Sequence, residues 1–571
     1  MTPVHFQLPP MRLERWRKYT VFALLAAGML APPILGPIRL NMFIPHADNE
    51  MLSRYQYQDT LPAHRGGIVD AIGRPLALNA DVYNVRADTL VLMREESRRV
   101  AEKLPDLVDI LEIDEQILRK KLSSGGRFVL LRRALPPSRA QDLRDLKLRG
   151  LRVEYDSKRY YPQKNTAATL LGYTNYEDVG RAGIEFVRHR YLAGKGGQDR
   201  GLRARDGTRL IRTDWSPPQD GRTITLSIDS RLQFYAYQAL KQALHHHHAA
   251  AGAAVIMDAH SGKILAAASL PSFNPNNIRG GNEKNRAITD AVEPGSLAKP
   301  FIVAAALHKN ETHAEEIFPT AKPHRIGGKV VKDEHIREDL SLPGIIQKSS
   351  NVGAAMLAWR VGAEHVWRLY QQLGFGGGKV LHLPGETGGH LRHYEDWRPQ
   401  DFTTHAYGYG FAVSLLQLLR GYSVFATDGL LVEPQIENGG IPKQRHRVLP
   451  AAVARQVRHF MEGVTRPGGT ATRAAIAGYR VAGKTGTAIK YGPNGYEDGK
   501  YRAFFVGIAP VSKPRYVVAV MIDEPSQNGY TGGVAAAPVF EKIMRRALFL
   551  NGVVPDDVDG DLSWSEEERR I

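Results

Sequence analysis

Apolar runs in the second half of the chain predict strands at both ends of one domain. Residues 253–257 and 264–268 flank the polar segment 258–262, which is typical of a β-hairpin. Residues 503–509 and 515–522 flank a second turn at 511–514 in the same way. Residues 223–228 form a further strand-like run, shortly after the Pro-Pro of 217–218.

Helical spacing of apolar residues lies between and beside these strands. Residues 229–246 carry apolar side chains with helical spacing at positions 232, 235, 237, 240 and 244, and the pattern of residues 538–550 predicts another helix. Strands at both ends with helices between them indicate an α/β domain with a mainly antiparallel sheet, which the C-terminal part of the chain completes. We assign this domain to residues 221–551.

The preceding region, residues 39–220, has a different pattern. It shows short strand-like runs, glycine-rich turns and one charged helical stretch at 95–123, without a repeat. The segment from Arg65 to Asp70, followed by residues 73–77, predicts a strand, a turn and a strand. No set of catalytic residues is recognisable there. The acidic tail at 552–571 lacks apolar periodicity and is expected to be mobile.

The N-terminus predicts a membrane anchor. Residues 12–18 include four basic residues, Arg12, Arg15, Arg17 and Lys18, and residues 19–38 carry no formal charge. About 20 such residues span the hydrocarbon core, and the basic flank places the N-terminus in the cytoplasm. Prolines at 32, 33 and 37 shorten the uninterrupted apolar helix, so a cleaved signal peptide is the alternative. Either way, the rest of the chain lies outside the inner membrane.

Composition narrows the functional classes. The 571 residues include no cysteine, which excludes a disulfide scaffold, thiolate metal sites and a cysteine nucleophile. The 76 basic and 59 acidic residues give a net charge of +17, which suits either nucleic acid or an anionic cell-envelope surface. The chain has no zinc-finger spacing, basic zipper or RNA-binding aromatic motif, so the envelope is favoured and no nucleic-acid partner is expected.

Three short motifs carry candidate chemistry. Ser296 and Lys299 are three residues apart before an apolar helical run, so the Lys299 amine can reach the Ser296 hydroxyl. A lysine with a depressed pKa can remove the proton of a serine hydroxyl, which is otherwise a poor nucleophile. Ser349 and Asn351 precede a second helical run. The third motif follows a strand-like segment at 479–482 and comprises Lys484, Thr485 and Gly486.

Together and in this order, the three motifs form the signature of penicillin-binding proteins and serine β-lactamases. The similarity extends further: the chain resembles class B penicillin-binding proteins of the cell-division type, penicillin-binding protein 3. It rests on segments 270–276, 287–296, 385–388, 407–410 and 466–470, and on 65–68, 159–162 and 180–185 in the N-terminal region. The resemblance implies a transmembrane helix, a non-catalytic α+β pedestal of the dimerisation type, and a transpeptidase domain whose five-stranded, mainly antiparallel sheet is flanked by helices.

The same resemblance implies a septal peptidoglycan D,D-transpeptidase that uses no metal or organic cofactor. Its substrates are stem peptides ending in D-Ala-D-Ala, and β-lactams trap its serine. Ser296 is the expected nucleophile, Lys299 the base, Ser349 a proton relay and Asn351 an orienting group. Lys484 is the fifth expected catalytic residue, which binds the terminal carboxylate and keeps Lys299 neutral. Thr485, Gly486 and Thr487 are expected to bind the substrate, and the N–H groups of Ser296 and Thr487 to hold the oxyanion. Implied partners are a polytopic septal glycosyltransferase, other division proteins and the bacterial inner membrane, with the catalytic domain periplasmic.

Several alternatives remain at this stage. An elongation-type class B enzyme commonly carries Asp where this chain has Asn351. A D,D-carboxypeptidase shares the donor chemistry and uses water as acceptor. A serine β-lactamase needs a positioned carboxylate, and no such segment stands between Asn351 and Lys484. No paired-Glu glycosyltransferase motif precedes the transpeptidase region, which disfavours a bifunctional class A protein. A non-enzymatic, penicillin-binding scaffold of the division complex is the last alternative.

Overall fold

The computed structural model describes residues 55–557 apart from residues 95, 205–207, 279–280, 334, 337, 440–444 and 493–494. The expected basic segment at 1–18, the expected anchor at 19–38 and the tail from residue 558 onward lie outside the described residues. No helix in the part of the chain that is described combines the length and apolar character needed to cross a membrane. The chain divides into two compact units, Met1–Ala63 with Lys195–Asp220, and His64–Gly194 with Gly221–Ile571.

The first unit contains a three-stranded antiparallel sheet. Its order is β1-β6-β7, with β1 at Gln56–Leu61, β6 at Gly197–Arg203 and β7 at Arg209–Ser216. Asp199 of β6 is buried and forms ion pairs of 2.9 and 3.0 Å with Arg209 and Arg212 of β7. The Tyr57 hydroxyl of β1 donates to the same carboxylate. The buried Asp199 carboxylate therefore connects all three strands through one hydrogen bond and two ion pairs.

The N-terminal part of the second unit is a mixed sheet that helices cover. The sheet order is β4-β3-β2-β8, and β5 also pairs with β3. The strands are β2 (Ile68–Val69), β3 (Pro75–Ala87), β4 (Val129–Leu135), β5 (Leu151–Tyr160) and β8 (Ile224–Thr225). Strand β8 pairs in parallel with β2, while the other pairs are antiparallel. The predicted run at 223–228 is thus a strand over two residues only.

The prediction of a single helical stretch at 95–123 is wrong, because the structure has three helices in this segment. These are α3 (Ser97–Glu102), α4 (Leu104–Leu111) and α5 (Glu115–Leu122). Pro105 lies in the first turn of α4, where its missing N–H costs no helical hydrogen bond. Glu112 has a left-handed φ of 48° and ends α4, and Asp114 caps α5 by accepting from two backbone N–H groups. Local capping therefore overrides the helical periodicity of the longer segment.

Glycine at position 66 allows two distant backbone segments to meet. A Cβ at Gly66 would lie 2.1 Å from the Arg222 carbonyl oxygen, so no other residue fits there without displacing the backbone. The neighbouring Arg65 is buried and forms a 2.5 Å ion pair with Glu185. Arg159 binds the other oxygen of the same carboxylate at 2.7 Å. The Arg-Gly-Gly motif thus combines a close approach of backbones with a buried ionic cluster.

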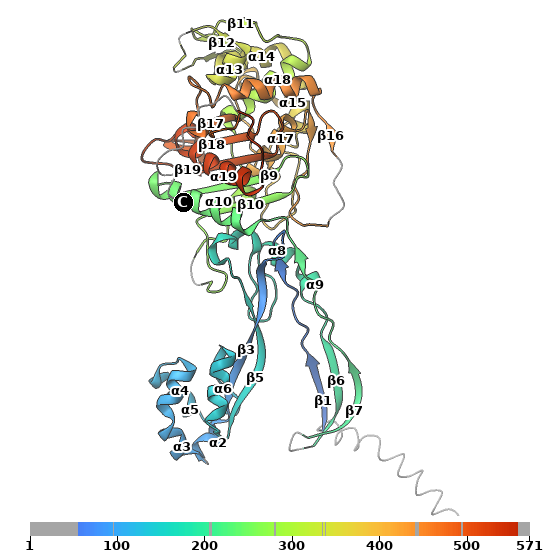
Figure 1. The fold of residues 1–571 in the computed structure, drawn as a ribbon, viewed down its shortest axis with the longest axis vertical. Helices are drawn as coiled ribbons and strands as arrows, with labels where there is room; N and C mark the ends of the chain where they lie inside the picture. Colours follow the sequence, from blue (N-terminus) through green and yellow to red (C-terminus); the bar gives the residue numbers. More distant parts are fainter. Residues whose placement is uncertain are drawn as a thin grey trace, which may run out of the picture. The chain divides into compact units, whose positions relative to one another are not determined.

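The C-terminal part of the second unit has a five-stranded antiparallel sheet of order β10-β9-β19-β18-β17 (Figure 1). The strands are β9 (Ala251–Asp258), β10 (Ile264–Leu270), β17 (Ala482–Gly492), β18 (Gly495–Ala509) and β19 (Tyr516–Asp523). Both predicted hairpins are present, and β9 pairs with β19, so segments more than 240 residues apart form the centre of the sheet. The expectation of a mainly antiparallel sheet completed by the C-terminal part of the chain is confirmed.

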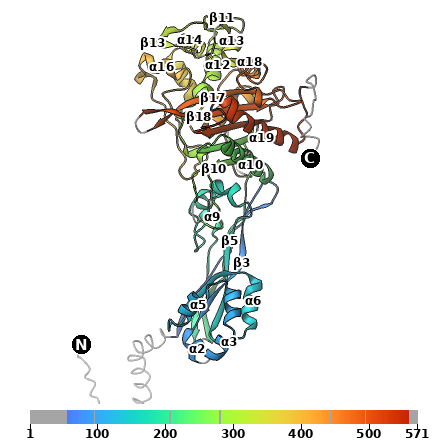
Figure 2. The ribbon, with the colours of Figure 1, turned by 90° about the vertical axis from the view of Figure 1, so that its left-hand side faces the viewer.

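Helices cover both faces of this sheet because β9 and β19 are buried along their whole length. The predicted helices are α10 (Ser230–His246), capped by Asp229, and α19 (Ala537–Leu550), which lie side by side on one face (Figure 2). α17 (Leu415–Ala426) packs on β19 and β9 from the other side. Beyond it lie α12 (Lys299–His308), α14 (Asn351–Val361) and α18 (Ala451–Glu462), which pack on one another or on β17.

The remaining elements are short or peripheral. The helices are α2 (Thr89–Arg94), α6 (Pro137–Asp145), α7 (Ala168–Leu171), α8 (Gly183–Val187), α9 (His189–Leu192), α11 (Arg286–Thr289), α13 (Leu342–Gln347), α15 (Ala363–Gln372) and α16 (Pro399–His405). Short helical turns are η1 (Lys164–Thr166), η2 (Gly295–Ala298), η3 (Tyr394–Asp396), η4 (Thr472–Ala474) and η5 (Gly532–Ala536). Short strands pair as β11 (Ile317–Phe318) with β14 (Leu340–Ser341), β12 (His324–Ile326) with β13 (Lys329–Val331), and β15 (Leu430–Leu431) with β16 (His446–Arg447).

The buried cluster around Glu185 predicts a strong effect of charge removal. Glu185→Gln leaves Arg65 and Arg159 buried without their counter-charge, and we expect a loss of about 3–5 kcal/mol of stability. Thermal unfolding followed by circular dichroism measures this loss. Glu154→Gln is the matched control, because Glu154 and its partner Arg86 remain 48 % and 39 % exposed, and its effect should stay below about 1 kcal/mol. Equal melting temperatures for both variants would contradict the prediction.

Candidate active site

Ser296 lies on a tight turn that two glycines permit. It belongs to η2, and Lys299 begins the helix that follows, with Pro300 in its first turn. Gly295 has a φ of +55°, and its N–H donates to the Gly408 carbonyl at 3.0 Å. A Cβ at Gly408 would lie 1.9 Å from the Gly295 carbonyl oxygen. The segment around Gly408 therefore supports the serine turn by direct backbone contact.

Lys299 is completely buried, and its amine points to the second motif. Its Nζ donates to the Ser349 carbonyl at 2.5 Å and to the Ser349 Oγ at 3.2 Å. Ser296 is half-buried, and its hydroxyl has no hydrogen-bond partner among the described residues. The structure thus brings Lys299 to Ser349, whereas the expected contact between Lys299 and the Ser296 hydroxyl is not among its hydrogen bonds.

Ser349 occupies a strained position between α13 and α14. Its φ of +63° is in the left-handed region, which few non-glycine residues adopt. The next residue, Ser350, caps α14 by accepting from the Gly353 N–H at 2.9 Å. Asp333 accepts hydrogen bonds from the Ser350 hydroxyl and from the Asn351 N–H, so it adds a second cap from a distant loop. These caps fix the turn that presents Ser349.

Asn351 lies at the first position of α14, as its motif predicts. Its side chain is half-buried and forms no hydrogen bond within the described part of the chain. The side-chain hydrogen bond between Asn351 and Lys299 that the family pattern suggests is therefore not formed among the described residues. An amide in this position remains available to a bound substrate.

The third motif lies within a strand rather than after one. The sequence places Lys484, Thr485 and Gly486 at the end of a strand at 479–482, but β17 begins at Ala482 and contains all three. Their backbones pair with Val506, Phe505 and Phe504 of β18, which extends the strand through the motif. The error arises because polar and glycine residues weaken the strand signal, whereas the ladder with β18 decides the structure.

Pairing in the sheet brings Lys484 to the other two motifs. Its Nζ donates to the Ser349 Oγ at 2.9 Å and to the Thr485 carbonyl at 3.1 Å. A Cβ at Gly486 would lie 3.0 Å from both the Pro294 carbonyl and the Leu297 side chain, so glycine lets β17 pass close to the serine turn. Thr487 Oγ1 accepts from the Gly532 N–H at 3.1 Å. The three motifs therefore converge, with Ser349 between the two lysines.

Burial controls the charge of both lysines. Lys299 and Lys484 are 0 % exposed, and burial lowers the pKa of Lys299 from its ordinary value to about 7. The negative charge of Asp333 opposes part of this shift. Burial, together with the nearby charge of Lys299, lowers the pKa of Lys484 well below its usual range. Burial of both amines and the repulsion that Lys299 exerts on Lys484 therefore favour neutral amines at this site.

Family models match most of the described chain. The penicillin-binding protein transpeptidase domain matches residues 252–545, and the penicillin-binding protein dimerisation domain matches residues 60–226. The chain belongs to the penicillin-binding proteins. The N-terminal match covers the mixed sheet with its helices, and the C-terminal match covers the five-stranded sheet and the three motifs. The expected dimerisation-type domain and transpeptidase domain are therefore both present.

Named relatives of this penicillin-binding protein come from several bacteria. The probable peptidoglycan D,D-transpeptidase PenA of Neisseria meningitidis serogroup A is 40 % identical over 542 residues, which cover 93 % of this chain and 92 % of the relative. The peptidoglycan D,D-transpeptidase FtsI of Escherichia coli K12 is 36 % identical over 497 residues, which cover 86 % of this chain and 84 % of the relative. These similarities confirm the class B, penicillin-binding protein 3 type.

Solved structures share the fold of this penicillin-binding protein. Penicillin-binding protein 3 of Mycobacterium tuberculosis, in complex with aztreonam, is similar with a TM-score of 0.68 and 26 % identity, covering 87 % of this chain and 98 % of that one. The transpeptidase domain of Burkholderia pseudomallei penicillin-binding protein 3 is similar with a TM-score of 0.54 and 39 % identity, covering 58 % of this chain and 97 % of that one.

Two carboxylates near the motifs escaped the sequence analysis. Asp333 precedes Ser350 by 17 residues, so no local spacing links it to the helix that it caps. Glu293 was seen only as part of the segment before Ser296, but it accepts from the Gly410 N–H at 2.7 Å and from the Tyr496 hydroxyl at 3.0 Å. Glu293 thus joins the serine turn, the 407–410 segment and β18 of this penicillin-binding protein.

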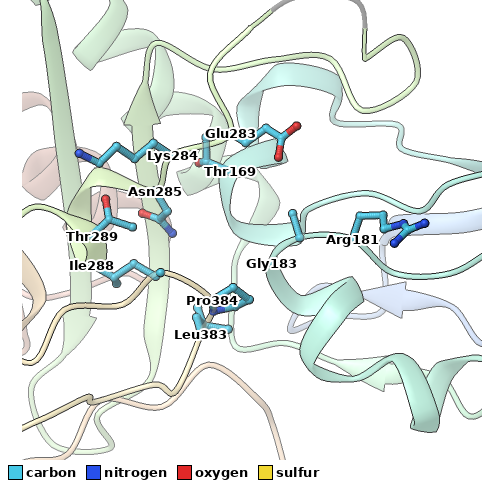
Figure 3. A pocket seen from close by; sticks show the side chains of 12 residues that line it. Thr169, Arg181, Gly183, Glu283, Lys284, Asn285, Ile288, Thr289, Leu383 and Pro384 are labelled. Atoms are coloured by element: carbon cyan, nitrogen blue, oxygen red, sulfur yellow. The ribbon is translucent and has the colours of Figure 1, made fainter.

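A separate cavity of about 510 Å³ lies away from these motifs (Figure 3). Elements of both matched domains line it, including Thr169 and Gly183 on one side and Asn285, Ile288 and Leu383 on the other. None of the eight predicted site residues is among its lining residues. The cavity therefore does not form part of the site around Ser349.

The contact between Gly408 and Gly295 predicts a steric requirement at position 408. Gly408→Ala adds a methyl group that meets the Gly295 backbone, in addition to the cost of about 1–2 kcal/mol for a left-handed residue. Gly362→Ala is a matched control, since Gly362 has a φ of +89° against +87° and open space around its Cβ position. We expect the melting temperature to fall further in Gly408→Ala than in Gly362→Ala. Equal decreases in melting temperature for the two variants would show that the close contact at Gly408 does not affect stability.

Proposed function

We propose that this protein is a septal peptidoglycan D,D-transpeptidase, anchored in the bacterial inner membrane with its catalytic domain in the periplasm. The observation that carries the activity is the convergence of two buried lysines on the Ser349 hydroxyl, next to the turn that presents Ser296. The names of the PenA and FtsI relatives support peptidoglycan as substrate. The septal role is supported by similarity to FtsI and to two penicillin-binding protein 3 structures.

The first half-reaction is acylation of Ser296. Its Oγ attacks the carbonyl carbon of the penultimate D-Ala in a stem peptide, while neutral Lys299 accepts the hydroxyl proton. A lysine whose pKa lies near 7 suits this role, because the amine is partly neutral at working pH and still basic enough to accept a proton. The N–H groups of Ser296 and Thr487 are proposed to stabilise the resulting oxyanion.

Collapse of the tetrahedral intermediate breaks the peptide bond and releases the terminal D-Ala. Its nitrogen needs a proton, and Ser349 is placed to relay one, because both Lys299 and Lys484 donate to its Oγ. Lys484 also lies beside Thr485, so a substrate carboxylate there would meet an amine and a hydroxyl. Binding of this anion favours the charged form of Lys484 and, through repulsion, the neutral form of Lys299.

In the second half-reaction, the amine of a neighbouring stem peptide attacks the acyl-enzyme and forms the cross-link. Water in place of the amine would make the protein a D,D-carboxypeptidase. The pedestal and the proposed anchor favour the transpeptidase, since they suit an enzyme held beside a growing polymer. They also suit binding of a septal glycosyltransferase and other division proteins. The mechanism uses only side chains and backbone groups, and requires no metal or organic cofactor.

Covalent labelling tests the assignment of Ser296. We expect a fluorescent penicillin to label the purified protein stably and the Ser296→Ala variant not at all, because the β-lactam carbonyl would lose its nucleophile. Ser526→Ala is the control, since its hydroxyl binds the His248 carbonyl on an exposed surface. Labelling of Ser296→Ala at the normal rate would overturn the assignment. A D-Ala-D-Ala donor peptide with an excess amine then separates the activities: an amide product supports transpeptidation, whereas acid alone indicates a carboxypeptidase.

The lowered pKa of Lys299 predicts the pH dependence of acylation. Below about pH 7 the amine is protonated and cannot accept the serine proton, so the acylation rate constant should rise with pH through about 7 and then level off. Asp333→Asn removes a negative charge that favours protonated Lys299, so the midpoint should move to lower pH. Rate constants with a fluorescent penicillin between about pH 5 and 9 measure both effects.

The control for this profile is Asp396→Asn, which neutralises an exposed carboxylate on η3. It should leave the midpoint unchanged, which separates the local effect of Asp333 from a general change in charge. A profile that is flat across this range in the unmodified protein would exclude Lys299 as the proton acceptor.

A further inference from the structure

A groove lies on the outer surface of the transpeptidase domain, between α10 and α19. It has a volume of about 620 Å³, and the segment 476–479, which leads into β17, forms one of its walls. Tyr235 and Ala239 line it from α10, and Phe549 lines it from α19. Phe549 exposes 73 % of its surface, which is unusual for a large apolar residue. The groove therefore offers apolar surface with no occupant among the described residues.

Basic side chains border this apolar surface. Lys542 donates to the Gln242 amide oxygen, and Arg546 lies over the Tyr235 ring with 4.1 Å between its Cζ and the ring centroid. Neither of these two cations forms an ion pair with a carboxylate in the described part of the chain. The groove thus combines aromatic and aliphatic walls with unneutralised positive charge, which suits an acidic segment that carries apolar side chains.

The chain itself leads to this groove after α19. The Tyr479 hydroxyl donates to the Val553 carbonyl, and the Asp556 N–H donates to the Gly478 carbonyl at 3.1 Å. Pro555 between them lines the groove. The carboxylate of Asp557 is already paired with Arg466. The last described residues are therefore fixed at the edge of the groove, and the sequence continues from there.

The segment that follows carries acidic and apolar side chains, which complement the basic and apolar side chains of the groove. Residues 558–571 contain five acidic and two basic residues, and Leu562 and Trp564 stand between the acidic positions. Trp564 is seven residues beyond Asp557, which allows a reach of roughly 25 Å at about 3.5 Å per residue. The groove wall from Lys542 to Phe549 is only about 10 Å long at 1.5 Å per helical residue. The segment is thus long enough to reach every part of the groove.

We propose that the α10–α19 groove binds residues 558–571 of the same chain. Leu562 and Trp564 contact the apolar walls, and the acidic residues face Lys542 and Arg546. A tether of a few residues gives an effective concentration on the order of millimolar, so weak contacts suffice for occupancy. Because the groove wall at 476–479 leads directly into β17, a bound segment lies on the connection that precedes Lys484.

The absence of native cysteine allows a direct test of this proposal by thiol labelling. Gln238→Cys places one thiol in the groove wall, and Gln371→Cys places one on the exposed surface of α15 as a control. We expect the thiol at position 238 to react at least fivefold more slowly in the full chain than in a chain that ends at Asp557. The thiol at position 371 should react at the same rate in both chains.

Substitutions identify the contacts that cause the protection. Trp564→Ala and Lys542→Glu should each remove most of it, whereas Ser563→Ala, which alters the neighbouring position, should retain it. Equal labelling rates at position 238 with and without residues 558–571 would overturn the proposal. Protection that grows with protein concentration would also overturn it, because it would indicate binding by the segment of a second copy.

Discussion

The proposed chemistry of this protein depends on two amines that are buried around one hydroxyl. An ammonium group loses several kcal/mol of hydration when it is buried without a counter-charge. Here Lys299 and Lys484 are both removed from solvent, and both donate to the Ser349 Oγ. The protein relieves this cost by lowering the pKa of each amine. Burial that would be unfavourable in a purely structural core thus favours the neutral amine that the proposed mechanism uses as its base.

Close packing of backbones brings the three motifs to this point. Gly295 and Gly408 contact each other directly, and Gly486 allows β17 to pass beside the serine turn. At Gly408 and Gly486 a side chain would move one of the motif segments, because each Cβ would come within about 3 Å of atoms of that segment. The caps on α14, from Ser350 and Asp333, hold the remaining segment. The positions of the motif side chains are thus determined by contacts that involve few of those side chains.

The N-terminal part of the same unit also buries charged side chains, but there they stabilise the fold. Glu185 is fully buried, and two arginines neutralise it with hydrogen-bonded geometry. Arg159 also binds the Gly66 carbonyl and the Asn79 side chain, so the ionic cluster connects backbone segments as well as charges. In this region the charges remain paired and contribute to structure, whereas around Ser349 two buried amines share an uncharged hydroxyl and have lowered pKa values.

The sequence by itself determined the local elements and the identity of the motifs. The helix at 230–246, its Asp229 cap and both hairpins follow from periodicity and turn residues within a few positions of one another. Only the tertiary structure decided that Lys484 meets Ser349 across 135 residues, that Asp333 caps α14, and that β17 extends through the third motif. These features depend on packing and on pairing with β18, and neither leaves a periodic signal in the chain. Local elements depend on interactions between residues that are close in sequence, whereas the position of a buried amine depends on the packing of the whole fold.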